Sequence, residues 1–247
     1  MPLDVSTLRT LLPERRIHYF SSTTSTMGEA ARLAAAGAPS GTVVLAEEQT
    51  AGRGRMGREW YSEADSGLYL TLILHRGHPV PWLTLAVGLA LGEAIGQFVE
   101  GRAAVDIRWP NDVLLGGRKC AGILVTSDGE AMLVGIGINV NHEVFPDELA
   151  ELATSMRCAT GRAHSREELL VRLLGLIDEY LLLPVEVIRE RFAKASSYAS
   201  GLRVELEDSG ISGVTCGLDP EGFLLLRLDN GQIERIVAGG VRPASAD

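Results

Sequence analysis

The chain has 247 residues, of which 46% are hydrophobic and 22% are charged, a composition typical of a globular protein rather than a disordered one. Its 23 Lys and Arg residues against 32 Asp and Glu residues give a formal net charge of −9, which does not favour binding to DNA. The three cysteines lie far apart without metal-ligand spacing, and the start of the sequence lacks a signal-peptide pattern, so we expect a cytoplasmic protein. Apolar stretches such as residues 68–74 and 83–95 are shorter than the roughly 20 residues of a membrane span, and no membrane segment is expected.

The first two thirds of the chain alternate between strand and helix patterns. A helix is expected over residues 27–36, because Thr26 and Glu29 have capping-box spacing and Gly37 would end it. Residues 81–99 carry apolar side chains at helical spacing and predict a long core helix. Short apolar or β-branched runs predict strands at residues 17–20, 42–46, 67–74, 105–109, 113–115, 120–125 and 132–140, with a hairpin turn at Gly116 and Gly117.

The last third changes from helical to β patterns. Ser165 and Glu168 form a second capping box before a helix that should end near Leu182, and Pro184 precedes another helix ending near Lys194. Strands are then expected at residues 203–207, 213–218, 223–228 and 233–237, separated by turn sequences. The pattern predicts an α+β fold, with helices packed on a mixed sheet in residues 1–198 and a small β-barrel in residues 199–247.

A glycine- and arginine-rich run at residues 52–58 is the most unusual local feature. Gly52, Gly54 and Gly57 match the G-x-G-x-x-G pattern of dinucleotide-binding proteins, but that pattern requires a helix at the glycines and an acidic residue about 20 positions later. No apolar helical stripe follows, and no Asp or Glu lies between Asp65 and Glu93. A P-loop is excluded because no Gly-Lys-Ser/Thr follows.

The same run places three guanidinium groups on a glycine-rich backbone, from Arg53, Arg55 and Arg58. Guanidinium groups match carboxylates and phosphates, and glycine lets backbone amides approach an anion closely. The loop could therefore order around an acyl-adenylate or a triphosphate. A solvated basic loop that binds nothing specific is the alternative.

Two further segments, at residues 108–124 and 135–141, are dense in polar residues or glycine. Asn111 and Asp112 follow Pro110 where a strand breaks, and Lys119 lies beside an apolar strand. An ordinary turn and a surface hairpin explain them equally well. Gly135 and Gly137 would let a flat ligand lie on a strand, or would mark a bulge.

Neither the serines nor the histidines show the spacing of a catalytic triad or a metal site. We therefore expect chemistry that depends on positioning and electrostatics, which suits the adenylation of a carboxylate.

Taken together and in order, these segments resemble the biotin–protein ligase family from about Ser22 to the end of the chain. The matching runs are Ala-Glu-Glu-Gln-Thr-Ala-Gly-Arg-Gly-Arg-Met-Gly-Arg at 46–58, Arg-Trp-Pro-Asn-Asp at 108–112, Lys119 with Gly-Ile-Leu at 122–124, and Gly-Ile-Gly-Ile-Asn-Val at 135–140. The resemblance implies a class II synthetase-like catalytic domain followed by an SH3-like barrel. It also implies that biotin is activated with ATP and Mg²⁺ to biotinyl-5′-AMP and passed to a lysine of a biotin carboxyl carrier protein.

The resemblance further assigns roles to individual residues. Those expected to bind biotin are Ser25, Thr26, Met27, Gln49, Arg53, Gly54, Arg55, Lys119, Gly122, Gly135 and Gly137. Those expected on the nucleotide side are Arg55, Arg58, Trp60, Arg108, Asn111 and Asn139, and those expected to act in catalysis are Arg55, Lys119 and Asp112. No residue is assigned directly to a metal, because Mg²⁺ is expected to be bound to ATP.

Two positions depart from the family pattern: Met27 stands in place of the common Asn, and Arg108 in place of Lys. Residues 22–24 offer an alternative register for the Ser-Thr pair, although the expected helix cap at Thr26 favours the later one. Regulatory members carry a helix-turn-helix before the catalytic domain, whereas 16 residues precede Ile17, so a DNA-binding repressor role is not expected. The resemblance also implies a homodimer formed through sheet edges. The rival interpretations are a lipoate or octanoate ligase and a non-enzymatic module that binds an anionic partner.

Overall fold

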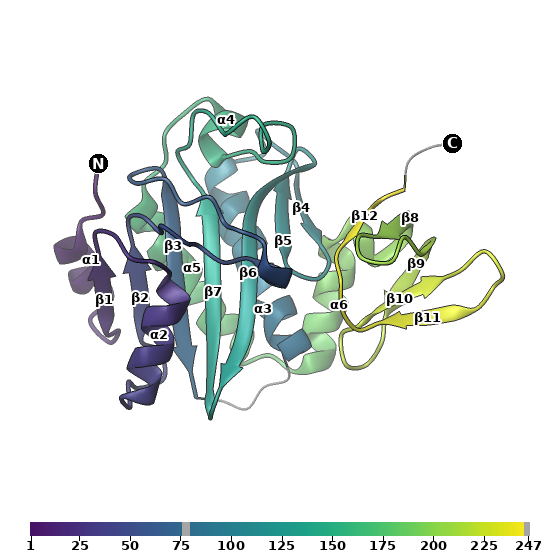
Figure 1. Cartoon of the computed structure of the whole chain (residues 1–247), viewed down its shortest axis with the longest axis horizontal. Coiled ribbons are helices and arrows are strands. Elements are labelled where there is room, and N and C mark those ends of the chain that lie inside the picture. Colours follow the sequence, from purple (N-terminus) through teal and green to yellow (C-terminus); the bar gives the residue numbers. More distant parts are fainter. Residues whose placement is uncertain (76–79, 245–247) are drawn as a thin grey trace.

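The computed structural model describes residues 1–75 and 80–244, and its main layer is a seven-stranded sheet with the order β1-β2-β3-β7-β6-β5-β4 (Figure 1). β1 and β2 are parallel, and the other neighbouring strands are antiparallel, so the predicted mixed sheet is confirmed. Its strands are β1 (Ile17–Phe20), β2 (Val43–Ala46), β3 (Gly67–Leu74), β4 (Val105–Arg108), β5 (Asp112–Leu115), β6 (Arg118–Asp128) and β7 (Ala131–Asn139).

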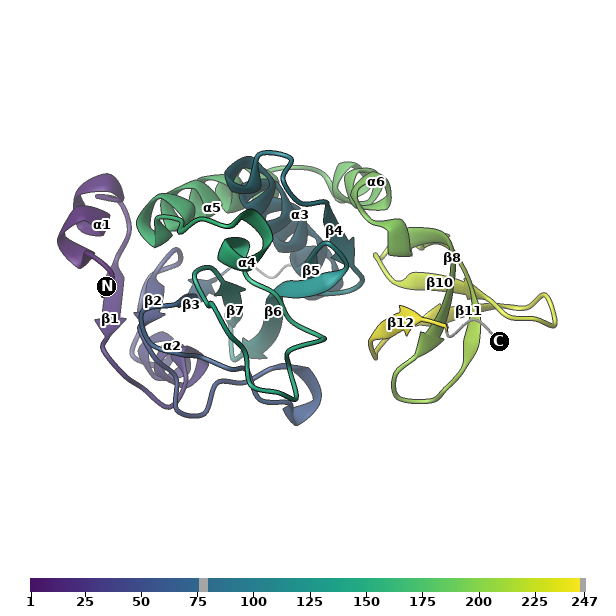
Figure 2. The same ribbon diagram turned by 90° about the horizontal axis from the view of Figure 1, so that it is seen from above.

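Helices cover both faces of this sheet, as the view from above shows (Figure 2). α3 and α5 lie together on one face, and α2 packs against β2, β3 and β7 on the other. The helices are α1 (Val5–Leu11), α2 (Thr26–Ala35), α3 (Val80–Val99), α4 (Met156–Thr160), α5 (Arg166–Leu181) and α6 (Val185–Ala195). The sequence pattern missed α1 and α4, which are short and carry little helical periodicity.

α3 is the central core helix. It has 20 residues, and 78% of its most apolar window is buried inside the fold, although by length and composition alone a helix of this kind could cross a membrane. The expectation that the apolar stretches are too short for a span is therefore wrong for the helix as formed. Its burial in the main hydrophobic cluster confirms the predicted core role.

The two predicted helix caps have different outcomes. Ser165 accepts a hydrogen bond from the Glu168 N–H at the start of α5, which confirms that cap. At α2 the prediction is wrong, because Ser25 is the N-cap, it makes no side-chain cap bond, and Thr26 is already the first helical residue. The Thr26 hydroxyl turns instead to the side chain of Gln49.

The C-terminal part is a second, antiparallel sheet with the order β11-β10-β9-β8-β12. Its strands are β8 (Ser200–Leu206), β9 (Ser212–Leu218), β10 (Leu224–Arg227), β11 (Ile233–Ile236) and β12 (Val241–Pro243), of which the sequence missed only the short β12. Within the described residues no pairing joins β11 to β12, so the sheet is barrel-like but open. One hydrophobic cluster continues across the expected domain boundary, from Phe192 through Tyr198 to Leu224. The division into two domains between residues 198 and 199 is therefore a proposal. Residues 245–247 of the proposed second domain lie outside the described residues.

Candidate active site

Four segments that are distant in sequence meet at one cavity of about 330 Å³. The start of α2 and the loop after β2 form one side, β6 and β7 form the floor, and the β4–β5 connection completes the wall. The structure brings every site residue predicted from the sequence to this cavity: Ser25, Thr26, Met27, Gln49, Arg53, Gly54, Arg55, Arg58, Trp60, Arg108, Asn111, Asp112, Lys119, Gly122, Gly135, Gly137 and Asn139.

Glycines keep the floor of the cavity flat. β7 pairs with β3 and β6 in unbroken register through Gly135 and Gly137, so the alternative of a bulge at these glycines is wrong. A Cβ on Gly137 would lie 2.4 Å from the Trp60 indole, and one on Gly122 would lie 2.9 Å from it. A Cβ on Gly135 would lie 2.7 Å from the Met27 sulfur. The glycines are therefore needed because side chains from the opposite wall lie directly on the strands.

The irregularity in this part of the sheet lies at Cys120. The β5–β6 register shifts between Val113, which pairs with Ala121, and Leu114, which pairs with Lys119, so Cys120 is the extra residue. Strict alternation would place Lys119 and Gly122 on opposite faces of β6. The bulge brings both to the cavity, where a Cβ on Gly122 would lie 3.1 Å from the Lys119 side chain.

The arginine-rich loop folds back on itself as a narrow hairpin. The Trp60 N–H donates to the Gly52 carbonyl at 2.9 Å, and the Gly54 N–H donates to the Arg58 carbonyl at 2.7 Å. A side chain at Gly52 would meet the Trp60 carbonyl at 2.6 Å. At the tip, a three-residue 3-10 turn stands where a dinucleotide fingerprint would need a helix, so the G-x-G-x-x-G match is not such a fingerprint.

Gln49 joins this loop to α2. Its Oε1 accepts from the Thr26 backbone N–H at 2.8 Å and from the Thr26 hydroxyl at 3.1 Å, while its Nε2 donates to the Ser62 hydroxyl at 3.0 Å. The neighbouring Ser25 hydroxyl is buried without a hydrogen-bond partner in the described part of the chain. A buried hydroxyl without a partner is costly, so this atom is suited to bind a polar ligand group.

Asp112 holds two cations at the wall. Its Oδ2 lies 2.6 Å from an Arg108 nitrogen, and its Oδ1 lies 2.7 Å from the Lys119 Nζ. Burial alone would lower the pKa of Arg108, but the Asp112 carboxylate outweighs it and holds that pKa above its ordinary value. The Lys119 ammonium also lies 5.2 Å from the centroid of the Trp60 ring, a cation–π distance. The positive charges are thus fixed in place before any ligand binds.

Arg55 reaches from the loop across to the wall. Its Nη1 donates to the Asn111 Oδ1 at 2.8 Å, and the Asn111 Nδ2 donates to the Ile123 carbonyl at 3.0 Å. Burial lowers the pKa of Arg55 below its ordinary value, against the opposing effect of Asp112. A partly desolvated guanidinium of this kind interacts strongly with an anion that enters the cavity.

The remaining predicted polar residues have more mixed surroundings. Asn139 is buried and donates to the Thr154 carbonyl at 3.1 Å, so its amide also supports the loop after β7. Arg53 is exposed at the cavity rim, and Arg58 forms an ion pair of 2.8 Å with Glu207.

Sequence reasoning missed the contribution of other parts of the chain. Glu207 and Gly240 reach the cavity from the C-terminal sheet, and Tyr61, Phe145 and Leu152 line it from two loops. Neither periodicity nor a motif marks these positions, because long-range packing places them there. Among the described residues no group of three His, Cys, Asp or Glu could hold a metal ion.

Two family models match the chain: the biotin/lipoate A/B protein ligase family over residues 19–142 and the biotin protein ligase C-terminal domain over residues 200–241. The bifunctional ligase/repressor BirA of Bacillus spizizenii is 34% identical, in a match that covers 95% of this chain and 76% of that protein. The biotin–[acetyl-CoA-carboxylase] ligase of Mycobacterium tuberculosis is 32% identical over 97% of this chain and 95% of its own. The biotin protein ligase of Aquifex aeolicus, solved in complex with biotin and ATP, matches with a TM-score of 0.82 and 30% identity over 92% of this chain and 97% of its own. The chain therefore belongs to the biotin protein ligase family.

Proposed function

We propose that this protein activates biotin with ATP to biotinyl-5′-AMP and transfers the biotin to a lysine of a biotin carboxyl carrier protein. The observation that carries the proposal is one cavity that brings together Arg55 of the loop, Lys119 of β6 and the glycines of the floor. The match to a biotin-specific C-terminal domain model favours biotin over lipoate or octanoate as the substrate.

The biotin ring would bind at the α2 end of the cavity. The unpartnered Ser25 hydroxyl offers a hydrogen bond to the ureido group, with Thr26, Gln49, Arg53 and Gly54 nearby. The flat floor of Gly122, Gly135 and Gly137 would accept the bicyclic ring, and Met27 would supply an apolar thioether where the family has Asn. Trp60 would have to move aside for a ligand to reach the floor, since its indole lies over Gly122 and Gly137.

The nucleotide would bind on the side of Asn111, Asn139 and Arg108, with Trp60 available to stack on a base and Arg58 to pair with a phosphate. Arg58 would first have to release Glu207. No described residues form a metal site, so we assign no residue to Mg²⁺, which would enter with the ATP phosphates and neutralise part of their charge.

In the first step a biotin carboxylate oxygen attacks the α-phosphorus. A mixed anhydride forms between the biotin carboxyl group and the α-phosphate. The bond between the α-phosphorus and the oxygen that bridges it to the β-phosphorus breaks, and pyrophosphate leaves. Arg55 and Lys119 would hold the biotin carboxylate and the α-phosphate together and stabilise the charge of the transition state. Asp112 holds the Lys119 Nζ at 2.7 Å, so the ammonium needs little reorganisation at the moment of reaction.

In the second step the carrier lysine amine attacks the biotinyl carbonyl and AMP leaves. Asp112 would orient this amine or receive its proton, as one carboxylate oxygen could release Lys119 for that purpose. We propose the acetyl-CoA carboxylase carrier or a related domain as acceptor, and a cytoplasmic location, which suits the free thiols of Cys120, Cys158 and Cys216. A homodimer, and an absence of DNA and membrane partners, complete the proposal.

The test is to incubate the purified protein with ATP and Mg²⁺, adding biotin, lipoate or octanoate in separate reactions, and to measure pyrophosphate release. We expect release with biotin, and transfer of biotin to an added carrier domain by mass spectrometry. Release only with lipoate or octanoate would assign the rival ligase activity, and no release with any acid would favour a non-enzymatic binding module.

A further inference from the structure

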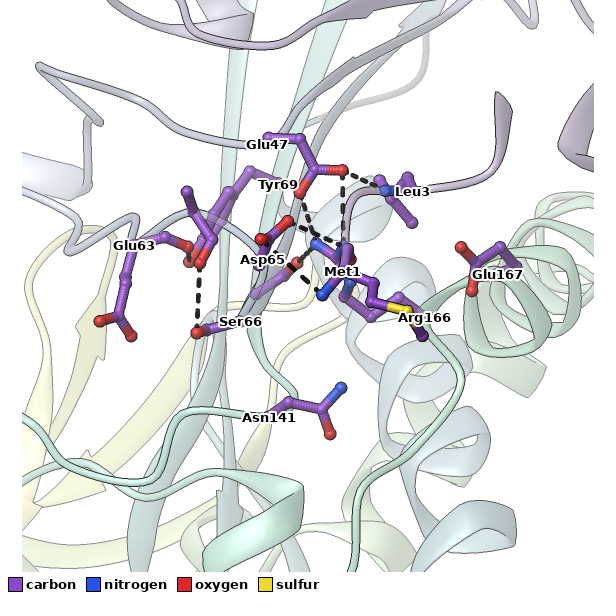
Figure 3. A network of polar contacts seen from close by, with 12 residues as sticks. Met1, Leu3, Glu47, Glu63, Asp65, Ser66, Tyr69, Asn141, Arg166 and Glu167 are labelled. Carbon is purple, nitrogen blue, oxygen red and sulfur yellow. Dashed lines mark hydrogen bonds and ion pairs between the residues drawn. The ribbon is translucent and has the colours of Figure 1, made fainter. Parts of the chain in front are cut away.

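A buried guanidinium outside the cavity connects both ends of the arginine-rich loop. Arg166, the first residue of α5, donates from Nη1 to the Glu47 Oε2 at 2.8 Å and to the Gly67 carbonyl at 2.9 Å (Figure 3). Glu47 directly follows β2, and Gly67 is the first residue of β3. The whole loop lies between these two residues, so one side chain ties its beginning to its end.

Burial makes this contact specific. The Arg166 side chain is 4% exposed and that of Glu47 is 5% exposed. The Glu47 carboxylate also accepts from the Leu3 N–H, and the Arg166 Nη2 donates to the Met1 carbonyl. A buried ion pair offsets the cost of losing its water only when its geometry is good and further hydrogen bonds satisfy both charges, so this contact holds Glu47 and Arg166 in one arrangement.

From this base toward the tip, a series of hydrogen bonds joins the two sides of the loop between β2 and β3. The first of these hydrogen bonds runs from the Gln49 side chain to the Ser62 hydroxyl. The next runs from the Trp60 N–H to the Gly52 carbonyl, and the last, near the tip, from the Gly54 N–H to the Arg58 carbonyl. Each of these hydrogen bonds sets the spacing for the next one, so a shift at the base would move Gln49, Trp60 and finally Arg55. Tyr69 adds a second support at the base, because its hydroxyl donates to the Glu63 carbonyl at 2.9 Å.

We propose that Arg166 is a positioning residue for biotin activation, which acts by fixing the spacing between Glu47 and Gly67 and thereby the position of the loop over the floor. Arg166 does not line the cavity, so it would act through Gln49 and the loop arginines rather than on the substrate. The inference rests on the proposed function for its kinetic readout but not for its structural one.

The test compares the double variant E47Q/R166M with wild type. Replacing both partners leaves no buried charge unpaired, which favours a folded protein. The double variant R15M/D178N is the matched control, because Arg15 likewise joins a carboxylate on α5 to a backbone carbonyl, at Gly41, away from the cavity. We expect the midpoint of thermal unfolding to stay close to wild type in both double variants.

We expect kcat/KM for biotin in pyrophosphate release to fall by about 10²-fold in E47Q/R166M, with a raised KM, and to stay unchanged in R15M/D178N. In the ligand-free protein, trypsin cleavage after Arg53, Arg55 and Arg58, followed by mass spectrometry, should become several-fold faster in E47Q/R166M only. Wild-type kinetics and wild-type cleavage in this variant would overturn the proposal.

A second variant keeps the test decisive if E47Q/R166M does not fold. Arg166→Lys keeps the charge next to Glu47, but a single ammonium cannot reproduce the planar fork that spans two acceptors. We expect normal thermal unfolding with faster loop cleavage and a kcat/KM for biotin lowered by about tenfold; unchanged cleavage and kinetics would overturn the proposal. If wild type itself releases no pyrophosphate with biotin, the proposed function fails, and the cleavage comparison still decides whether Arg166 fixes the loop.

Discussion

The floor and the loop of the cavity both carry predicted site residues, but the two regions are held in place in different ways. The floor belongs to β6 and β7, which pair with each other from Ala121 to Asp128 without a register shift. The loop between β2 and β3 is held by a few hydrogen bonds between its two sides and by the Arg166 contacts to Glu47 and Gly67 at its base. A backbone ladder fixes its side chains cooperatively, whereas a loop with few hydrogen bonds opens at low cost. Under the proposed function, the rigid floor would define where biotin lies, and the less firmly held loop would pack over it.

The largest expected effect comes from two cations that line the cavity, one on the floor and one in the loop. Lys119→Ala on the floor and Arg55→Ala in the loop should each lower kcat for pyrophosphate release by about 10²–10³-fold, because each removes a fixed donor from the developing negative charge. Steady-state kinetics with biotin and ATP measures this. The two variants should differ in KM for biotin, which rises for Arg55→Ala, since Arg55 also closes the loop onto Asn111.

Arg118→Ala is the control, because Arg118 is an exposed cation next to Lys119 and does not line the cavity. It should leave kcat and both KM values unchanged. Near-normal pyrophosphate release from Lys119→Ala or Arg55→Ala would show that the assignment of these charges to the transition state is wrong.

A smaller effect is expected where the floor and the loop touch. Gly137→Ala would place a Cβ 2.4 Å from the Trp60 ring, so the indole must leave the floor. Since the loop yields more easily than the sheet, we expect the free energy of unfolding to change by less than about 1 kcal/mol. The added methyl group would itself stand on the floor where the biotin ring is proposed to lie, so we expect the KM for biotin to rise about tenfold. Chemical denaturation and biotin titration separate the two quantities.

Gly175→Ala in α5 is the control for the added methyl group, because nothing described lies within 4 Å of a Cβ there. It should stabilise the helix by about 0.5–1 kcal/mol without changing the KM for biotin. A large loss of stability in Gly137→Ala with unchanged kinetics would mean that the loop is as rigid as the floor.

The same contrast explains what could be predicted from the sequence. The predicted strands of the main sheet begin and end within three residues of the observed ones, because apolar runs and glycine turns are local signals. The site residues were predicted because several motifs follow one another in the same order as in the biotin–protein ligase family, whereas any one of them alone would have been weak evidence. The cap at Thr26 was misassigned because Gln49, distant in sequence, competes for its hydroxyl. Arg166 could not be recognised either, since an arginine at a helix start looks like any surface residue until the fold pairs it with Glu47.

The smallest expected effect lies at the loop's contact with the C-terminal sheet. Arg58 and Glu207 form an ion pair whose arginine is 61% exposed, and exposed pairs contribute little to stability. Glu207→Gln should leave the free energy of unfolding almost unchanged. It frees Arg58 and removes a negative charge from the cavity wall, so we expect the KM for ATP to fall by about two- to threefold at low salt and the difference to vanish as salt is raised.

Glu205→Gln provides the matched control, because Glu205 lies two residues away on the same sheet and pairs with Arg242 rather than with the loop. The same change in net charge there should leave the KM for ATP unaltered. If Glu207→Gln instead raises the KM for both ATP and biotin, the ion pair holds the loop closed, and the C-terminal sheet would share with Arg166 the task of fixing it. A fall in the KM for ATP alone would mean that Glu207 competes with the ATP phosphates for Arg58. The position of the loop would then depend on Arg166 rather than on the C-terminal sheet.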